Sequence, residues 1–257
     1  MINDYKKVLT EYFTEFSIDL DMIDIVETSD VDNAYLKLRP DQIGKEQIDS
    51  QQYNGFAVAP MDKNGRFTIL LNANRMLLSK QCGNFDWVGT VVHEATHIDD
   101  HTKYGKIISV ENHDDLYDRT KHNMFGCWTE FHARSMGHYY VYKYRKCNNC
   151  KTAEEEYILN TEIEQLIDWF NKKDAVTDNG YMRLYILMQF LGMLYGLQLH
   201  YPNTITNELV HDIFCETNEI EELYVFLKNN NSVEKIHSKF DVMHSICKKA
   251  FLTCRNI

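Results

Sequence analysis

The feature that most constrains the fold is a long run of helical periodicity that begins at residue 86. From there on, apolar residues recur at intervals of three and four, which is the spacing of one face of an α-helix. Gly105, Gly180 and Pro202 are the points at which this pattern is broken. The sequence therefore predicts a mainly helical body, with helices over residues 87–103, 123–146, 153–172, 181–200, 205–229 and 232–252.

The residues before this run predict a mixture of helix and strand. Residues 3–17 have the apolar periodicity of an amphipathic helix, and residues 31–38 predict a short helix that ends before Pro40. Residues 19–26 form a short apolar run that predicts a strand.

A β-hairpin is predicted next. Residues 53–61 and 66–72 each have the composition of a strand, and the turn residues 62–65 lie between them. We therefore expect an α+β fold, in which a small antiparallel β-sheet or hairpin packs on a mainly helical body.

The net charge of −11 limits the partners of this chain. An acidic protein repels nucleic acids and anionic membrane surfaces, so we expect neither as a partner. The one short basic cluster, Lys143, Arg145 and Lys146, is expected to be a solvated helix end.

Cysteine usage and the N-terminal residues indicate a cytoplasmic protein. Residues 1–20 carry four acidic residues where an export signal needs an apolar run. The longest apolar stretch, residues 185–199, is too short and too interrupted to span a bilayer. Seven cysteines, an odd number, favour reduced thiols, and we expect Cys147 and Cys150 to lie in a helix-ending loop.

The segment His93-Glu94-Ala95-Thr96-His97 carries the predicted chemistry. Two histidines four residues apart point the same way on a helix, so their ring nitrogens can share one Zn²⁺ ion at about 2.0–2.1 Å. Glu94 then stands beside the metal and can take a proton from the metal-bound water. The motif predicts a zinc site with His93 and His97 as ligands and Glu94 as general base.

The rest of this helix agrees with such a site. Asp86 is the expected N-cap, which sets where the helix begins. The face opposite the two histidines is apolar, so it can bury in a core while the histidines form the floor of a cleft. The residues of this apolar face are Val88, Val91, Val92, Ala95 and Ile98.

Zinc needs a third protein ligand, and Glu130 is the residue that we favour. Glu130 projects from a stripe of small residues, Gly126, Ala133 and Gly137, which lets another helix approach closely. His101, one turn beyond His97, and Asp100, which points about 60° away from His97, remain alternatives.

Supporting roles fall to residues near these ligands. Carboxylates can orient the imidazoles through their second ring N–H, and the candidates for this role are Asp99, Asp100 and Glu111. Tyrosine and histidine side chains can stabilise an oxyanion, and the candidates are Tyr139, Tyr140, His132, His138 and His113.

The order strand 67–72, the helix with His93 and His97, and a later helix with Glu130 resembles the zincin metallopeptidases that use Glu as third ligand, the gluzincins. Over about residues 54–145 it is also distantly similar to the ImmA/IrrE-like family of compact cytoplasmic metallopeptidases. The segment Glu130-Phe-His-Ala matches the Glu, apolar residue and Ala that follow the metal motif in that family. The resemblance implies a zincin-like metal helix, and an extended substrate lying along an edge strand, for which residues 67–72 are the candidate.

We therefore expect a zinc-dependent peptidase that acts on a peptide or protein substrate. Residues 1–150 would form the catalytic region, and residues 151–257 a helical C-terminal region packed on it. The alternative is a zinc-stabilised helical protein that binds or regulates a partner and cleaves nothing, in which Glu94 would be dispensable.

Overall fold

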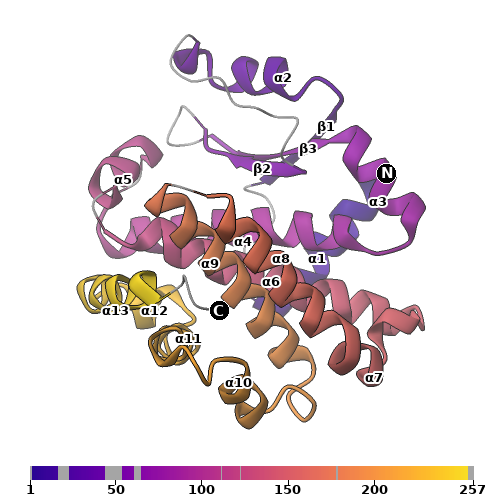
Figure 1. The fold of residues 1–257 in the computed structure, drawn as a ribbon. Helices are drawn as coiled ribbons and strands as arrows, with labels where there is room; N and C mark the ends of the chain where they lie inside the picture. Colours follow the sequence, from indigo (N-terminus) through magenta and orange to yellow (C-terminus); the bar gives the residue numbers. More distant parts are fainter. Residues whose placement is uncertain are drawn as a thin grey trace. The chain divides into compact units, whose positions relative to one another are not determined.

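The computed structural model describes residues 2–16, 23–43, 54–60, 65–110, 112–121, 123–177 and 179–253 (Figure 1). The chain divides into two compact units, Met1–Asp118 and Arg119–Ile257. Most described residues are helical and one small sheet is present, which confirms the α+β prediction. The sequence-based division at residue 150 separates regions by expected role, and it stays a prediction.

The sheet of the first unit has three strands in the order β1-β3-β2. β2 (Gly55–Val58) and β3 (Phe67–Asn72) pair antiparallel, as predicted for the hairpin, whose expected turn at residues 62–65 lies mostly outside the described residues. β1 (Ile23–Thr28) pairs with β3 in parallel, so the prediction of a purely antiparallel sheet is wrong. Parallel strands need a long crossover connection, and the chain between β1 and β3 supplies one.

β3 is the central strand, so the expectation that residues 67–72 form an edge is also wrong. Its residues Ile69, Leu70 and Leu71 are fully buried. A strand covered on both faces and paired on both sides has a continuous apolar run rather than an alternating pattern.

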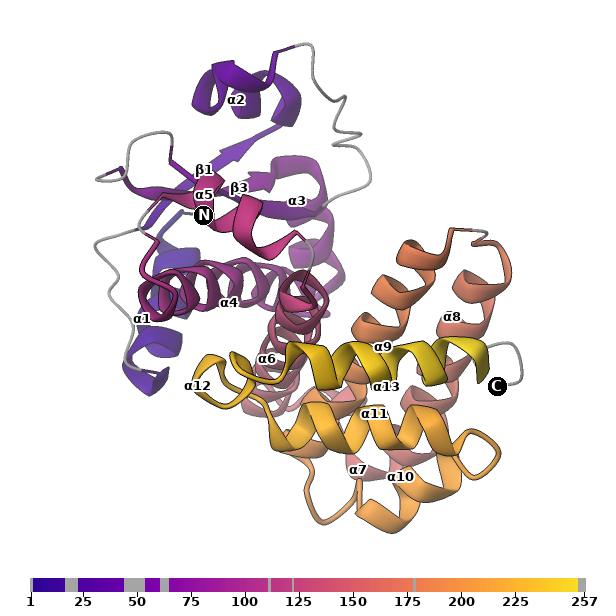
Figure 2. The same cartoon turned by 90° about the vertical axis from the view of Figure 1, so that its left-hand side faces the viewer.

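Helices cover both faces of this sheet (Figures 1 and 2). On one face lies α2 (Val31–Leu38), whose Val31 packs with Val58 and Leu70. On the other lie α1 (Ile2–Phe16) and α4 (Asp86–Ile107). The expected helices at residues 3–17 and 31–38 are thus confirmed, and a short 3-10 helix, η2 (Pro40–Gln42), follows α2.

The junction before α4 differs from the prediction. α3 (Ala73–Cys82) was not expected, and α4 begins at Asp86 with Phe85 at the N-cap position, so Asp86 is not the cap. The Asn84 side chain accepts from the Asp86 amide at 3.2 Å, and Ser79 Oγ accepts from the Trp87 amide at 2.9 Å. Side chains from the preceding turn and from α3 therefore satisfy the first two amides of α4, which have no acceptor within the helix.

The first unit ends in α5 (His113–Thr120), which crosses into the second unit and was also not expected. The second unit is helical, and its long helices are α6 (Phe125–Cys147), α8 (Ile163–Ala175), α9 (Gly180–His200), α11 (Asn218–Asn229) and α13 (Phe240–Thr253). The shorter elements are η4 (Lys151–Ala153), α7 (Glu155–Tyr157), the π-helical segment η5 (Ile158–Glu162), α10 (Asn207–Ile213) and α12 (Val233–Ile236).

Three of the predicted long helices are interrupted. The helix expected over residues 153–172 contains η4, α7, η5 and α8 in succession. The helix expected over 205–229 is divided into α10 and α11, and that over 232–252 into α12 and α13. Between α10 and α11, Phe214 ends the first helix and the buried residue Thr217 precedes the second. No Gly or Pro marks that break, so periodicity alone did not show it.

α6 and α9 pack closely within the second unit (Figure 2). The close approach depends on Gly192 and Gly196 of α9, where a Cβ would lie 2.6 Å from the carbonyl oxygens of Phe131 and Ser135. Gly126, part of the expected small-residue stripe on α6, has no atom within 4 Å of such a Cβ. Gly192 and Gly196 of α9 therefore permit the close helix packing, whereas Gly126 of α6 has no part in it.

Cys147 and Cys150 lie where α6 ends, as predicted, and both are free thiols. Asn149 has a left-handed backbone, with φ 53°, and the Cys150 amide donates to the Arg145 carbonyl at 3.0 Å. This is the hydrogen bonding of a Schellman motif, which gives the two cysteines a structural position in a helix end. No helix in the described part of the chain has the length and apolarity needed to cross a membrane.

Candidate metal centre

The helix α4 presents its apolar face to the core, as the sequence predicted. Val88, Val91, Val92 and Ala95 are fully buried. Thr96 is also fully buried, and its Oγ1 lies 2.7 Å from the Tyr12 hydroxyl of α1. These contacts fix the rotation of α4 about its axis and thereby set where its polar side chains point.

His93 and His97 point toward each other from successive turns of α4. Their Nε2 atoms lie 3.1 Å apart, and their rings are nearly perpendicular, at 88°. His93 is only 8% exposed. Two imidazole nitrogens of one helix are therefore aimed at a common point, which the i, i+4 spacing predicted.

Glu94 is held beside this pair by the backbone of β2. Its Oε2 accepts a hydrogen bond of 2.8 Å from the Ala57 amide, while its Oε1 lies 4.0 Å from His93 Nε2. Glu94 is 7% exposed. The backbone contact with Ala57 was not predicted, because a backbone donor leaves no signal in the amino-acid sequence.

Glu130 belongs to α6, in the second unit, and is 3% exposed. Within that unit its Oε1 accepts from Gln189 Nε2 of α9 at 2.9 Å and from Arg134 Nη2 at 3.3 Å. Burial, together with the Glu130 charge, raises the pKa of the Cys127 thiol to about 12, so this thiol stays protonated.

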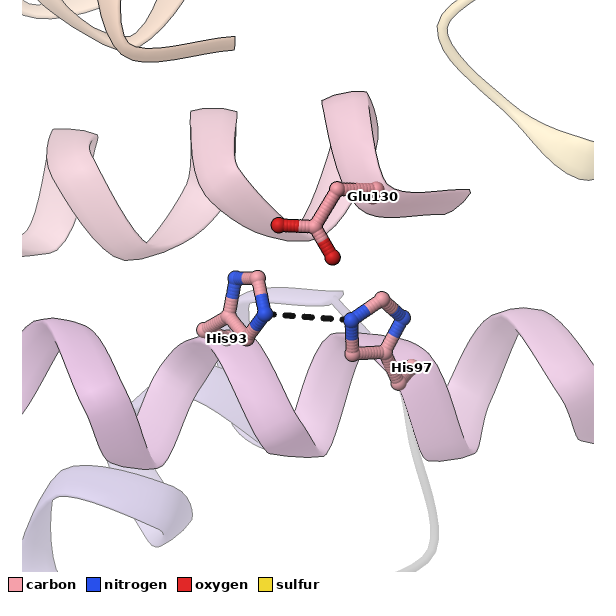
Figure 3. A group of neighbouring side chains, drawn as sticks. All are labelled: His93, His97 and Glu130. Atoms are coloured by element: carbon pink, nitrogen blue, oxygen red, sulfur yellow. Dashed lines mark hydrogen bonds between the residues drawn. The ribbon is translucent and has the colours of Figure 1, made fainter. Parts of the chain in front are cut away.

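The three predicted ligands are drawn together in Figure 3. His93, His97 and Glu130 each offer one ligand atom, and these atoms lie within 4.8 Å of one another. In the part of the chain that the structure describes, this is the one group of three His, Cys, Asp or Glu residues with that geometry. The alternative ligands His101 and Asp100 are not members of it.

Of the residues expected in orienting roles, the structure describes Asp99 and Asp100. Asp99 forms an ion pair of 2.7 Å with Lys103. Asp100 is buried, with 1% of its surface exposed. Glu111 lies outside the described residues.

The expected oxyanion-stabilising residues are divided between the two units. His113, in the first unit, lies 3.0 Å from His101 between ring nitrogens. In the second unit, His132 stacks on Trp128, and Tyr139 packs edge-on against His200.

Tyr140 and His138 have positions typical of core residues. Tyr140 is fully buried. His138 Nδ1 lies 3.1 Å from the Met193 carbonyl oxygen, and burial lowers the pKa of His138 to about 3, so its ring is neutral at physiological pH.

Comparison with known proteins gives no match. No protein-family model matches the chain, and no significant match was found among curated proteins or among solved structures.

Proposed function

We propose that this chain is a zinc-dependent hydrolase that cleaves peptide bonds, with His93, His97 and Glu130 as zinc ligands and Glu94 as general base. One observation carries the proposal. The Nε2 atoms of His93 and His97 lie 3.1 Å apart, and Oε1 of the buried Glu94 carboxylate lies 4.0 Å from His93 Nε2.

The pair of histidines fits zinc. Two Zn–N bonds of about 2.0–2.1 Å at a tetrahedral angle separate the two nitrogens by about 3.3 Å. The Nε2 atoms of His93 and His97 are 3.1 Å apart, so a shift of a few tenths of an ångström accommodates the ion. Two nitrogens and one carboxylate are a donor set that zinc accepts, whereas magnesium and calcium prefer oxygen ligands alone.

Glu130 is favoured over His101 and Asp100 as third ligand. Gln189 and Arg134 both donate to Oε1 of this buried carboxylate. Ligating carboxylates are commonly held by such outer hydrogen bonds, which fix their orientation. Glu130 also belongs to the one group of three potential ligands among the described residues, which His101 and Asp100 do not.

The chemistry assigned to this chain is proton transfer by Glu94. When bound, zinc would polarise the scissile carbonyl and lower the pKa of a water molecule. Glu94 accepts the proton of the attacking water and passes it to the leaving amine. The Ala57 amide holds Oε2 and so directs Oε1 toward the side of His93.

A substrate strand fits the outer edge of β2. In the described sheet, β2 pairs with β3 on one side only. Ala57 faces Ile69 in the register, and its amide points away from β3 to Glu94. An extended peptide adding to this edge would therefore pass directly beside the general base.

The test separates an active peptidase from a zinc-stabilised binding protein. Glu94→Gln should keep its zinc and lose hydrolysis of a peptide library about 10²–10⁴-fold, the usual contribution of a general base. Glu156→Gln, a change at an exposed glutamate of the second unit, is the control and should keep both properties. Full activity in Glu94→Gln would refute the general-base role. A zinc-loaded wild type that cleaves no peptide would refute the peptidase.

A further inference from the structure

We propose that His101 and His113 form a second, weaker binding site for a divalent transition-metal ion, separate from the candidate zinc centre. The proposal concerns the first unit only and does not rest on the proposed hydrolase function. It begins from a pair of ring nitrogens, His101 Nδ1 and His113 Nε2, that lie 3.0 Å apart.

The backbone between the two histidines is tightly folded. The Val110 amide donates to the Gly105 carbonyl at 2.8 Å and the Ser109 amide to the Lys106 carbonyl at 3.3 Å. With Ser109 in the left-handed region, at φ 57°, these bonds form a Schellman motif. A Cβ on Gly105 would lie 2.7 Å from the Val110 carbonyl oxygen, so glycine is needed for this reversal.

This reversal brings the start of α5 back over α4. His113 is the first residue of α5, and His101 lies four residues before Gly105 on α4. The Phe67 ring of β3 packs edge-on against His113, with 6.4 Å between ring centroids. Both imidazoles therefore come from anchored elements, and little ordering is needed to bring them together.

The separation of the nitrogens matches that of the candidate zinc ligands. The two Nε2 atoms of His93 and His97 are 3.1 Å apart, and the nitrogens of His101 and His113 are 3.0 Å apart. A hydrogen bond between the two rings also fits this spacing, with the proton on one of the two facing nitrogens. A divalent ion binds both nitrogens when that proton moves to the other nitrogen of the same ring, which frees both facing lone pairs. The His101 and His97 rings are neighbours, with centroids 6.4 Å apart, but His101 is not a member of the group formed by His93, His97 and Glu130, so the two pairs share no ligand.

The ligand count predicts the affinity and the preferred metal. In the described residues no third His, Cys, Asp or Glu completes a group of three here. Both histidine residues are of intermediate exposure, so water can reach the pair and fill the other coordination positions. Two imidazoles with water give a weak, exchangeable site, and the Irving–Williams order favours Ni²⁺ and Cu²⁺ over Mn²⁺, while Mg²⁺ and Ca²⁺ prefer oxygen.

Titration of the zinc-loaded full chain with Ni²⁺ tests the site. Calorimetry in a buffer that does not bind metal should show one further equivalent of Ni²⁺, with at least tenfold weaker binding in His101→Gln and in His113→Gln. His244→Gln, which removes an exposed histidine of α13, is the matched control and should bind as wild type does.

The wild-type titration tests the second metal site even if a variant fails to fold. A wild type that takes up no further Ni²⁺ would overturn the proposal, and so would folded His101→Gln and His113→Gln variants that keep the second equivalent. Because the readout is metal binding, this result is independent of hydrolysis. Glu94→Gln should retain the second equivalent whether or not the enzyme proposal holds.

Discussion

Replacing Gly192 by alanine should destabilise the second unit, whereas replacing Gly126 by alanine should not. A Cβ at Gly192 would lie 2.6 Å from the Phe131 carbonyl oxygen and 2.8 Å from Arg134 Cβ. Both atoms belong to the α6 backbone or its first side-chain carbon, so they cannot rotate away and the two helices must separate. At Gly126 the added methyl group meets nothing within 4 Å.

The paired variants isolate the packing contribution. Both gain the helix propensity of alanine, about 1 kcal/mol over glycine. Only Gly192→Ala has the overpacking cost of about 1–3 kcal/mol, and contacts below 3 Å with backbone place it in the upper part of that range. The free energies of unfolding of the two variants should therefore differ by about 2–3 kcal/mol.

Urea unfolding followed by far-UV circular dichroism measures this difference. We also expect Gly192→Ala to hold zinc less tightly, because Gln189 lies one turn earlier on α9 and donates to Glu130. Equal unfolding midpoints for Gly192→Ala and Gly126→Ala, with equal slopes, would refute the close packing of α6 on α9.

Three further predictions address the candidate centre. Ala57→Pro removes the N–H that holds Glu94, and should slow hydrolysis about 10–100-fold with zinc content unchanged. Ala57→Ser keeps the N–H and should keep the rate of hydrolysis. Equal rates in the two variants would show that the contact is dispensable. Glu130→Ala should weaken zinc binding, measured by chelator competition, beyond the ~10–100-fold typical of losing an outer contact; unchanged affinity would transfer the ligand role to another residue. Exchanging Cys147 and Cys150 for serine should leave elemental zinc content as it is, and loss of a full equivalent would reveal a metal role for these thiols.

The long helices could be predicted because their signal is local. In α1 and α4 the buried apolar residues recur at the three- and four-residue spacing that the sequence displays. The break between α10 and α11 was not predicted, because the Phe214–Thr217 turn contains neither Gly nor Pro. α5 was missed because most of its residues are polar and exposed.

Strand pairing needed information that the sequence does not hold locally. The antiparallel pairing of β2 with β3 follows from a short connection between two apolar runs. The parallel pairing of β1 with β3 joins Ile23 to Phe67, and no nearby pattern predicts contacts at that separation. Because β1 pairs with β3, β3 is the central strand and β2 is the edge strand beside α4.

The candidate centre shows the same division between local and distant signals. His93, Glu94 and His97 were identified because one helix brings them together at fixed spacing. The Ala57 amide and the Gln189 side chain, which hold Glu94 and Glu130, come from other elements and were not foreseen.

Zinc content is the most direct test of the central claim that this chain holds a catalytic metal. Wild type and the His93→Ala, His97→Ala double variant would be loaded with zinc, dialysed against a weak chelator and measured by elemental analysis, with circular dichroism as the check on folding. The proposed centre predicts about one tightly held zinc per wild-type chain and none in the folded double variant. A wild type that retains no zinc, or a double variant that retains as much as wild type, would contradict the account.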